Sequence, residues 1–256
     1  MGHNSWLTLL LEQFKGNLTH NATLLGETVV GQRKPGWHDF EPITASIIVA
    51  VLLLLVGMHV RARLTKIEEA VVPDETLTVR TFMEAFLGYF YDLAKSVMDA
   101  DRAKRYFPII ATSACFVFFS NVLALIPGMP VPTSSLSITL GTALVVFVAF
   151  NVYGVMVNGG AYIKHLAGPS LALAPLLFLI EIISLCVRPI TLAVRLMVNM
   201  AVDHLVLTTF AGLVAILVPI PVMLLGCIVV VVQTLVFTLL TTIYIGLATE
   251  DMHAHH

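Results

Sequence analysis

Long apolar stretches separated by polar segments dominate the chain. A helix that crosses a bilayer needs about 20 mostly apolar residues. Five stretches can supply one such helix each: Ile43–Val60, Phe107–Ile126, Ser135–Val157, a fourth that begins near Leu171, and a fifth within Leu205–Thr249. The last of these has no Asp, Glu, Lys, Arg or His and is too long for one upright crossing. Pro219 and Pro221 interrupt it, so we expect a helix end and a turn there.

A different pattern occupies the segment Thr78–Met98. Apolar side chains recur there every three or four residues, as on one face of a helix: Phe82, Phe86, Phe90, Leu93 and Val97. Glu84, Asp92 and Lys95 fall largely away from this face. The segment is therefore predicted to be an amphipathic helix that lies in the membrane interface.

Composition supports a membrane protein. Of the 256 residues, 58% are hydrophobic and only 12% are charged, whereas a soluble domain is nearer half apolar and a quarter charged. The net charge of −2 and the absence of a basic tract give no reason to expect nucleic acid binding. The three cysteines stand far apart in apolar stretches, which argues against a disulfide framework or a zinc site. The predicted fold is an all-α integral membrane protein with about five transmembrane helices and one interfacial helix.

Basic residues predict the orientation of the chain. The segment between the first two apolar stretches holds eight of them: Arg61, Arg63, Lys66, Arg80, Lys95, Arg102, Lys104 and Arg105. The segment before the first stretch holds three, and the loop after the second holds none. The positive-inside rule then places residues 61–105 and the C-terminus in the cytoplasm and the N-terminus outside. We expect an extracytoplasmic segment at 1–40, a membrane domain at 41–250 and a tail at 251–256.

The fourth apolar stretch carries ionisable residues, which are costly at membrane depth and indicate function by default. Glu181, Arg188 and Arg195 are seven residues apart, nearly one stripe of a helix, and Asn199 follows Arg195 by one turn. Such a stripe is expected to face water or a partner rather than lipid.

These charged residues allow different interpretations. Arg188 precedes Pro189 and could be a snorkelling or structural arginine near a kink, and Glu181 could simply pair with Arg188. Arg195 lies about 24 residues into the stretch and has no acid at i±3 or i±4. Its counter-charge must therefore come from elsewhere.

Several motifs carry a family resemblance. The pattern Arg-Pro-x-x-x-x-x-Arg-Leu-x-x-Asn-Met at Arg188–Met200 resembles the signature of subunit a of F-type ATP synthases. Phe119–Pro127, Pro132–Ser137 and Gln233 followed by Val236–Leu240 are also similar to that family. The resemblance implies that the last two spans form a long tilted hairpin against a ring of c subunits.

The resemblance also implies a mechanism and a set of site residues. Arg195 would face the ring carboxylates between two aqueous half-channels, so that proton flow drives rotation of the ring and ATP synthesis. His204 and Asp203 would line the outer half-channel and Glu181 the inner one. Asn199 and Gln233 would position Arg195 or water, although buried amides in membrane helices also simply join helices together.

One position departs from the family pattern. Many members carry Glu or His seven residues before the glutamine, where this chain has Gly226, and Asp203 stands where small residues are usual. We therefore hypothesise that the acid has moved from the fifth span to the fourth across one interface, and that Gly226 leaves room for it.

The resemblance implies partners as well: the c-subunit ring, b-type peripheral stalk subunits, the F1 sector through the stalk, and membrane lipid. We expect no cofactor or metal, and the histidine-rich end of the tail is too short to suggest a metal site. The chain has no GxxxxGK[ST] phosphate loop, so we expect a non-catalytic subunit, with ATP chemistry in F1. The expected location is the bacterial plasma (inner) membrane, with the mitochondrial inner membrane as the alternative.

Three other functions compete with the proton-driven subunit. A sodium-coupled subunit would share Arg195 and differ mainly in ligands on the c ring. A self-contained channel or carrier would need its own substrate site, such as paired intramembrane acids, which the sequence does not show. A purely structural membrane subunit would leave Arg195 without a purpose.

Overall fold

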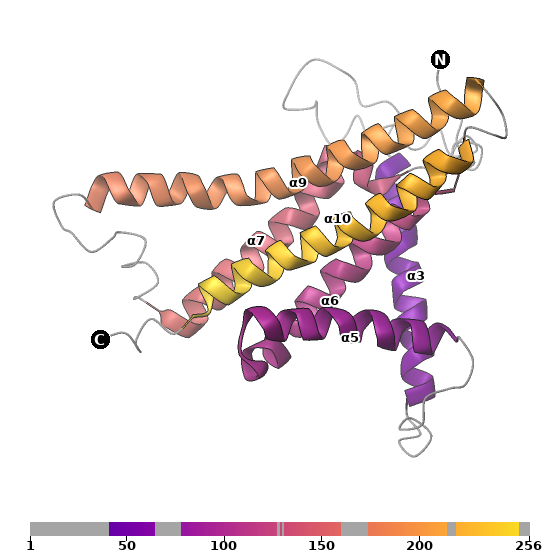
Figure 1. The fold of residues 1–256 in the computed structure, drawn as a ribbon. Coiled ribbons are helices and arrows are strands. Elements are labelled where there is room, and N and C mark those ends of the chain that lie inside the picture. Colours follow the sequence, from indigo (N-terminus) through magenta and orange to yellow (C-terminus); the bar gives the residue numbers. More distant parts are fainter. Residues whose placement is uncertain are drawn as a thin grey trace, which may run out of the picture.

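The computed structural model describes residues 41–64, 78–126, 129, 131–159, 174–213 and 219–250. These residues form helices without strands, in the order α3 (Glu41–Leu64), α5 (Val79–Val97), α6 (Ala100–Leu123), the 3-10 helix η2 (Pro132–Ser134), α7 (Leu136–Asn158), α9 (Ala174–Leu213) and α10 (Pro219–Ala248) (Figure 1). All of the α-helices except α5 are long and apolar enough to cross a membrane. The predicted all-α, multi-pass membrane fold is thereby confirmed. The predicted segments 1–40 and 251–256 lie outside the described residues.

Helix boundaries differ from the apolar stretches in instructive ways. Helix α6 begins at Ala100, seven residues before the predicted span, because a helix forms its own backbone hydrogen bonds whether or not its first turns are charged. Helix α10 begins at Pro219, and Pro221 lies in its first turn, where a missing N–H group removes no intrahelical bond. The helix boundary predicted at these prolines is confirmed, and the turn itself, at 214–218, lies outside the described residues.

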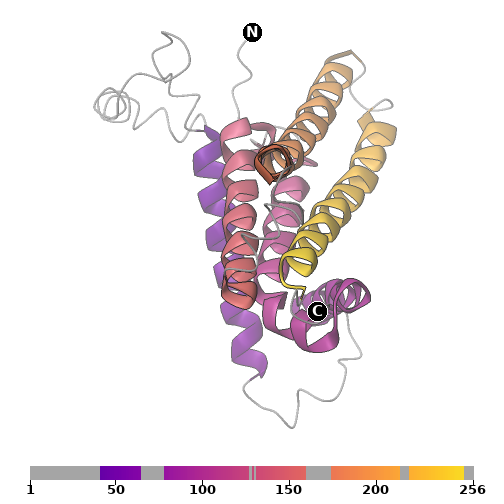
Figure 2. The same ribbon diagram turned by 90° about the vertical axis from the view of Figure 1, so that its left-hand side faces the viewer.

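The bundle has an upright part and a slanted part. Helices α3, α6 and α7 stand side by side, whereas α9 and α10 slant across them (Figure 2). Small buried residues such as Ala103, Ala114 and Ala143 allow helices to approach closely, as is usual in membranes. Phe150 and Phe237, both almost fully buried, fill the space between the two parts.

Four of the five buried threonine hydroxyls described on α10 and at its C-terminal end are satisfied by the preceding helical turn, and Thr241 is the exception. Four buried side chains donate to the carbonyl four residues earlier, at 2.7–2.8 Å: Thr234, Thr238, Thr242 and Thr249. Such bonds let α10 bury polar side chains without a partner from another helix. The helix can therefore pack polar and apolar residues alike against its neighbours.

The C-terminal end of α10 is held by side chains from two other helices. Asn158 of α7 donates to the carbonyls of Ala248 (3.3 Å) and Glu250 (2.9 Å). Arg102 of α6 donates to the carbonyl of Thr249 at 3.4 Å. These bonds satisfy carbonyls that a helix end leaves without intrahelical partners.

Helix α5 lies across the ends of the upright helices (Figure 1). It forms over nearly the predicted segment, but the face it buries in this chain contains Met83, Phe90 and Ala94. Phe82 and Val97, which belong to the predicted apolar face, are exposed. An amphipathic helix at the interface needs apolar residues toward both the bundle and the lipid, which accounts for the broader apolar face.

Candidate functional site

Helix α9 carries the ionisable residues that the sequence singled out. It is 40 residues long, about 60 Å at 1.5 Å per residue, and it continues through Pro189. Because this length is about twice the hydrocarbon thickness of a bilayer, α9 cannot cross upright. Figure 1 shows it running nearly across the view, at a large angle to α3, with its C-terminal end beside the start of α10 and its N-terminal end projecting away from the bundle.

Arg195 lies on an exposed aliphatic face of α9. The exposed neighbours on this face recur every three or four residues: Ile183, Val187, Ile190, Val194, Val198 and Val202. The opposite face is buried against the bundle by Leu192, Leu196 and Met200. Among the described residues Arg195 is exposed and forms no ion pair. A guanidinium thus stands alone on a surface that is otherwise suited to lipid or to an apolar partner.

Two polar contacts join α9 to α10, one on each side of Arg195. Asn199 donates to the side-chain oxygen of Gln233 at 2.9 Å. Toward the other end, the guanidinium of Arg188 lies 5.4 Å from the ring centre of Tyr244, close enough for a cation–π interaction. The two contact residues on α9, Arg188 and Asn199, are eleven residues apart, and so are Gln233 and Tyr244 on α10. Eleven residues are three turns and about 16 Å, so the two contacts repeat along the antiparallel helices.

Glu181 lies close to Arg188, in agreement with the interpretation that these two residues pair. The carboxylate oxygen lies 3.8 Å from the guanidinium nitrogen, with side chains 44% and 28% exposed, respectively. This separation is longer than a hydrogen bond, so the pair is loose and both groups remain open to water. Arg188 therefore has two neighbours of its own, Glu181 and Tyr244, which Arg195 lacks among the described residues.

Asp203 faces Gly226 across the two helices. A Cβ atom at residue 226 would lie 3.3 Å from the Oδ2 atom of Asp203 and 3.0 Å from the Cδ2 atom of Leu125. A larger residue at 226 would therefore press against both side chains. Asp203 is half-buried in this position. His204 lies in α9, but its side chain is outside the described part of the structure.

Polar atoms without partners lie near the C-terminal end of α6. Leu125 follows this end in the turn after the helix. The side-chain oxygen of Asn121 accepts a hydrogen bond from Thr133 at 2.8 Å. Its amide nitrogen and the hydroxyl of Ser120 are buried and have no hydrogen-bond partner among the described residues. Buried groups of this kind are commonly satisfied by ordered water.

The structure brings together more residues than the sequence indicated. Asn199 and Gln233, which were each predicted to position Arg195 or water, bond to each other. Gly226 lies beside Asp203. Tyr244 and the unpartnered atoms of Ser120 and Asn121 were not singled out. The eleven-residue spacing of Gln233 and Tyr244, matching that of Asn199 and Arg188, was the available signal for Tyr244.

Comparison with known proteins identifies the family. The profile of the family described as ATP synthase A chain matches residues 43–246. A protein of Sorangium cellulosum called ATP synthase subunit a is 54% identical over 253 residues, covering 99% of each chain. Proteins of the same name from Bdellovibrio bacteriovorus and Geobacter sulfurreducens are 39% and 38% identical, covering 84% and 83% of this chain and 94% and 89% of theirs. The chain therefore belongs to the ATP synthase subunit a family.

Proposed function

We propose that the exposed face of α9 lies against a rotating ring of c subunits, and that Arg195 couples proton flow to rotation of that ring. Membership of the family makes this chain a subunit of the ATP synthase complex, with a stator role in proton translocation through Fo. The observation that carries the finer proposal is the exposed guanidinium, without an ion pair among the described residues, in an aliphatic face.

The electrostatics of a membrane favour this role for Arg195. An unpaired charge at membrane depth is costly, so the guanidinium needs a carboxylate or water. A carboxylate on each c subunit would supply the charge in turn. Because guanidinium stays protonated at any working pH, Arg195 cannot relay protons itself. It instead favours the ionised form of each passing carboxylate and forms a positive barrier between two half-channels.

The outer half-channel is proposed to run past Asp203 and His204. The carboxylate of Asp203 faces Gly226, and Leu125, in the turn that follows α6, is the third side chain at this contact. The unpartnered polar atoms of Asn121 and Ser120 offer water two of its hydrogen-bonding partners there. In this arrangement the acid stands on α9, and the glycine on α10 accommodates it.

The inner half-channel is proposed to open at Glu181. Its carboxylate is partly exposed on the N-terminal half of α9, about four turns before Arg195, and is only loosely paired. The Arg188–Tyr244 contact holds α9 to α10 between this opening and Arg195. The Asn199–Gln233 bond does the same on the outer side, so both contacts fix how far Arg195 projects toward the ring.

Orientation and assembly complete the proposal. Basic residues gather at one end of the bundle, around α5, the start of α6 and the end of α10. The positive-inside rule makes this end cytoplasmic, with residues 1–40 outside, 41–250 in the membrane and 251–256 inside. The bacterial relatives favour a plasma (inner) membrane. Peripheral stalk subunits of the b type would hold this stator to F1, where ATP is made.

Replacement of Arg195 by alanine tests the proposal. In vesicles that contain the assembled complex, ATP-driven proton pumping by the Arg195→Ala variant is expected to fall by at least about 100-fold, and passive proton leak to rise. The control Lys95→Ala removes a positive charge that is paired with Asp92 at the surface, and should pump normally. Pumping by Arg195→Ala at a rate near the wild type would overturn the proposal.

A further inference from the structure

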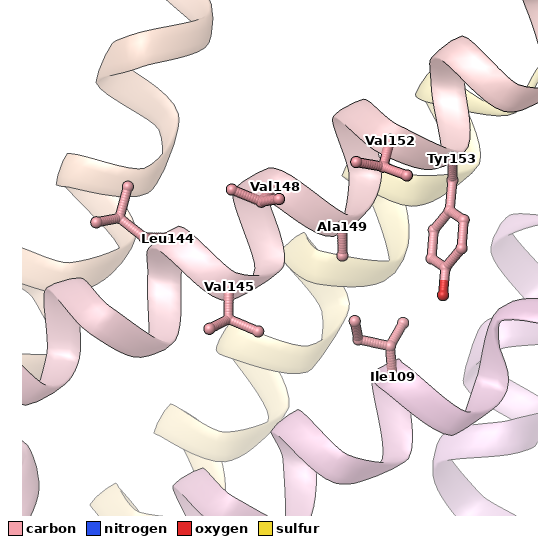
Figure 3. Close-up of a pocket in the computed structure, with 7 residues that line it drawn as sticks. All are labelled: Ile109, Leu144, Val145, Val148, Ala149, Val152 and Tyr153. Atoms are coloured by element: carbon pink, nitrogen blue, oxygen red, sulfur yellow. The ribbon is translucent and has the colours of Figure 1, made fainter.

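A hollow lies on the outer surface where α6 and α7 meet. It has a volume of about 440 Å³ and is lined by Ile109 of α6 and by a stripe of α7 from Leu144 to Tyr153 (Figure 3). We call it the α6–α7 groove. Its wall is aliphatic except for Tyr153, and Val145 and Val148 are more than half exposed. Because valine side chains are stiff, the groove has a defined shape even before anything occupies it.

Tyr153 lines one end of the groove and is connected through Tyr106 to a basic side chain. Arg105 precedes Ile109 by one helical turn on the same face of α6. Its guanidinium carbon lies 5.8 Å from the ring centre of Tyr106. The ring of Tyr106 in turn contacts that of Tyr153, with centres 4.7 Å apart. A continuous path therefore leads from a cation, through two tyrosines, into the apolar groove.

The cations at this end have no negative partner among the described residues. Lys104 and Arg105 are both exposed and form no ion pair there. The other basic residues described on α5 and α6 are each paired with a carboxylate: Arg80 with Glu84, Lys95 with Asp92, and Arg102 with Asp99. Asp101 stands one helical turn before Arg105 but forms no ion pair among the described residues. Lys104 and Arg105 are therefore open to a negative charge from another molecule.

We propose that the α6–α7 groove binds an acyl chain of an anionic phospholipid, whose phosphate is held by Lys104 and Arg105. An acyl chain fits an aliphatic, outward-facing hollow because both are apolar. Guanidinium and ammonium groups donate charge-assisted hydrogen bonds to phosphate oxygens. Tyrosines favour the depth at which the headgroup region begins, and Tyr153 lines the groove at the end that is linked to Arg105 through the buried Tyr106. Basic pockets beside membrane helices bind anionic headgroups in this way.

Charge distinguishes this occupant from two others. A zwitterionic lipid would fill the groove but bring its own positive charge close to Lys104 and Arg105. An apolar helix from a partner subunit would cover Val145 and Val148 but would not neutralise the charge of Lys104 or Arg105. An anionic lipid fits both features, because its acyl chain fills the apolar groove and its phosphate neutralises the two cations.

Photolabelling of the intact ATP synthase tests the proposal. The complex is reconstituted in phosphatidylcholine bilayers with a trace of phosphatidylglycerol that carries a photoactivatable group in one acyl chain. A parallel sample contains the same probe on phosphatidylcholine, and mass spectrometry maps the labelled residues. The anionic probe should label Leu144–Tyr153 several times more strongly than the zwitterionic probe.

Two kinds of variant separate charge from shape. Lys104→Gln and Arg105→Gln should each lower the preference for the anionic probe by about fivefold, while Lys95→Gln, which alters a paired lysine, should leave it unchanged. Val148→Trp should fill the groove and reduce labelling by both probes. Should Val148→Trp fail to assemble, the glutamine variants still decide, because they change exposed side chains.

Three outcomes would overturn the proposal. Equal labelling by the two probes in the wild type would mean ordinary boundary lipid. Anionic labelling that survives both glutamine substitutions would mean that the basic pair holds no phosphate. An unlabelled groove, together with cross-linking of Val148→Cys to a stalk subunit, would mean that a protein helix occupies it.

Discussion

Helices α9 and α10 are both long and apolar, but they differ in whether their polar side chains find partners within the chain. On α10 the buried Thr234, Thr238 and Thr242 donate to their own backbone, and Gln233 accepts a hydrogen bond from Asn199. On α9 the guanidinium of Arg195 is exposed and without an ion pair among the described residues. A polar group that is satisfied within the chain points to packing. A charge left open in a membrane helix points to a partner that the chain does not contain.

The largest effect expected from this comparison, after that of Arg195, concerns Asp203. Asp203→Asn should lower ATP-driven proton pumping by about tenfold or more, because an amide cannot exchange protons. The control Asp92→Asn changes a surface carboxylate paired with Lys95 and should pump normally. Unchanged pumping by Asp203→Asn would remove this acid from the proton path.

Moving the carboxylate from residue 203 to residue 226 provides a second test of this acid. Asp203→Gly combined with Gly226→Asp places the carboxylate on α10, at the same interface, and should restore part of the pumping lost in Asp203→Asn. Because a side chain at 226 would press on Leu125, the further change Leu125→Ala should improve the recovery. Failure of both combinations to pump better than Asp203→Asn would show that the acid acts only from α9.

A smaller effect is expected where the two helices join. Gln233→Leu should lower proton pumping by about threefold, because hydrogen bonds between membrane helices contribute about 0.6 kcal/mol on average. The double variant Asn199→Leu/Gln233→Leu should lose no more than the single one, since both changes remove the same bond. Additive losses in pumping assays would mean that the two amides act separately.

The anchor at the end of α10 should affect stability more than transport. Asn158→Ala removes two hydrogen bonds to carbonyls at that end and should destabilise the subunit by about 1 kcal/mol. The measurement is the temperature at which subunit a dissociates from the complex, which should fall by about 2–4 °C. Thr142→Val is the control on α7, because Thr142 donates to the carbonyl of Ile138 in its own helix. Equal shifts for both variants would contradict the anchor.

The smallest effects test whether threonines on α10 are satisfied. Thr238→Val removes a hydroxyl that bonds to its own helix and should change stability by less than about 0.5 kcal/mol. Thr241→Val removes a buried hydroxyl without a partner among the described residues, and should stabilise the subunit by about 0.5–1 kcal/mol. Thermal dissociation of the complex measures both, and a destabilised Thr241→Val would indicate a water bonded at that hydroxyl.

The sequence by itself determined the number and type of the membrane helices. Each apolar stretch must satisfy its backbone hydrogen bonds internally in a bilayer, so length and hydropathy suffice to predict a helix. The same local logic marked Arg195, because neither an acid at helical spacing nor a nearby helix end was present to neutralise it. The amphipathic pattern of Thr78–Met98 also predicted α5, although not which part of its broad apolar face is buried.

Only the tertiary structure decided which residues meet across helices. The contacts of Asn199 with Gln233, Arg188 with Tyr244, and Asp203 with Gly226 depend on how α9 and α10 rotate and slide against each other. That register is set by the packing of buried side chains around each helix, and many registers share one hydropathy pattern. Periodicity in the sequence fixes the face on which a residue stands, whereas packing fixes what stands opposite it.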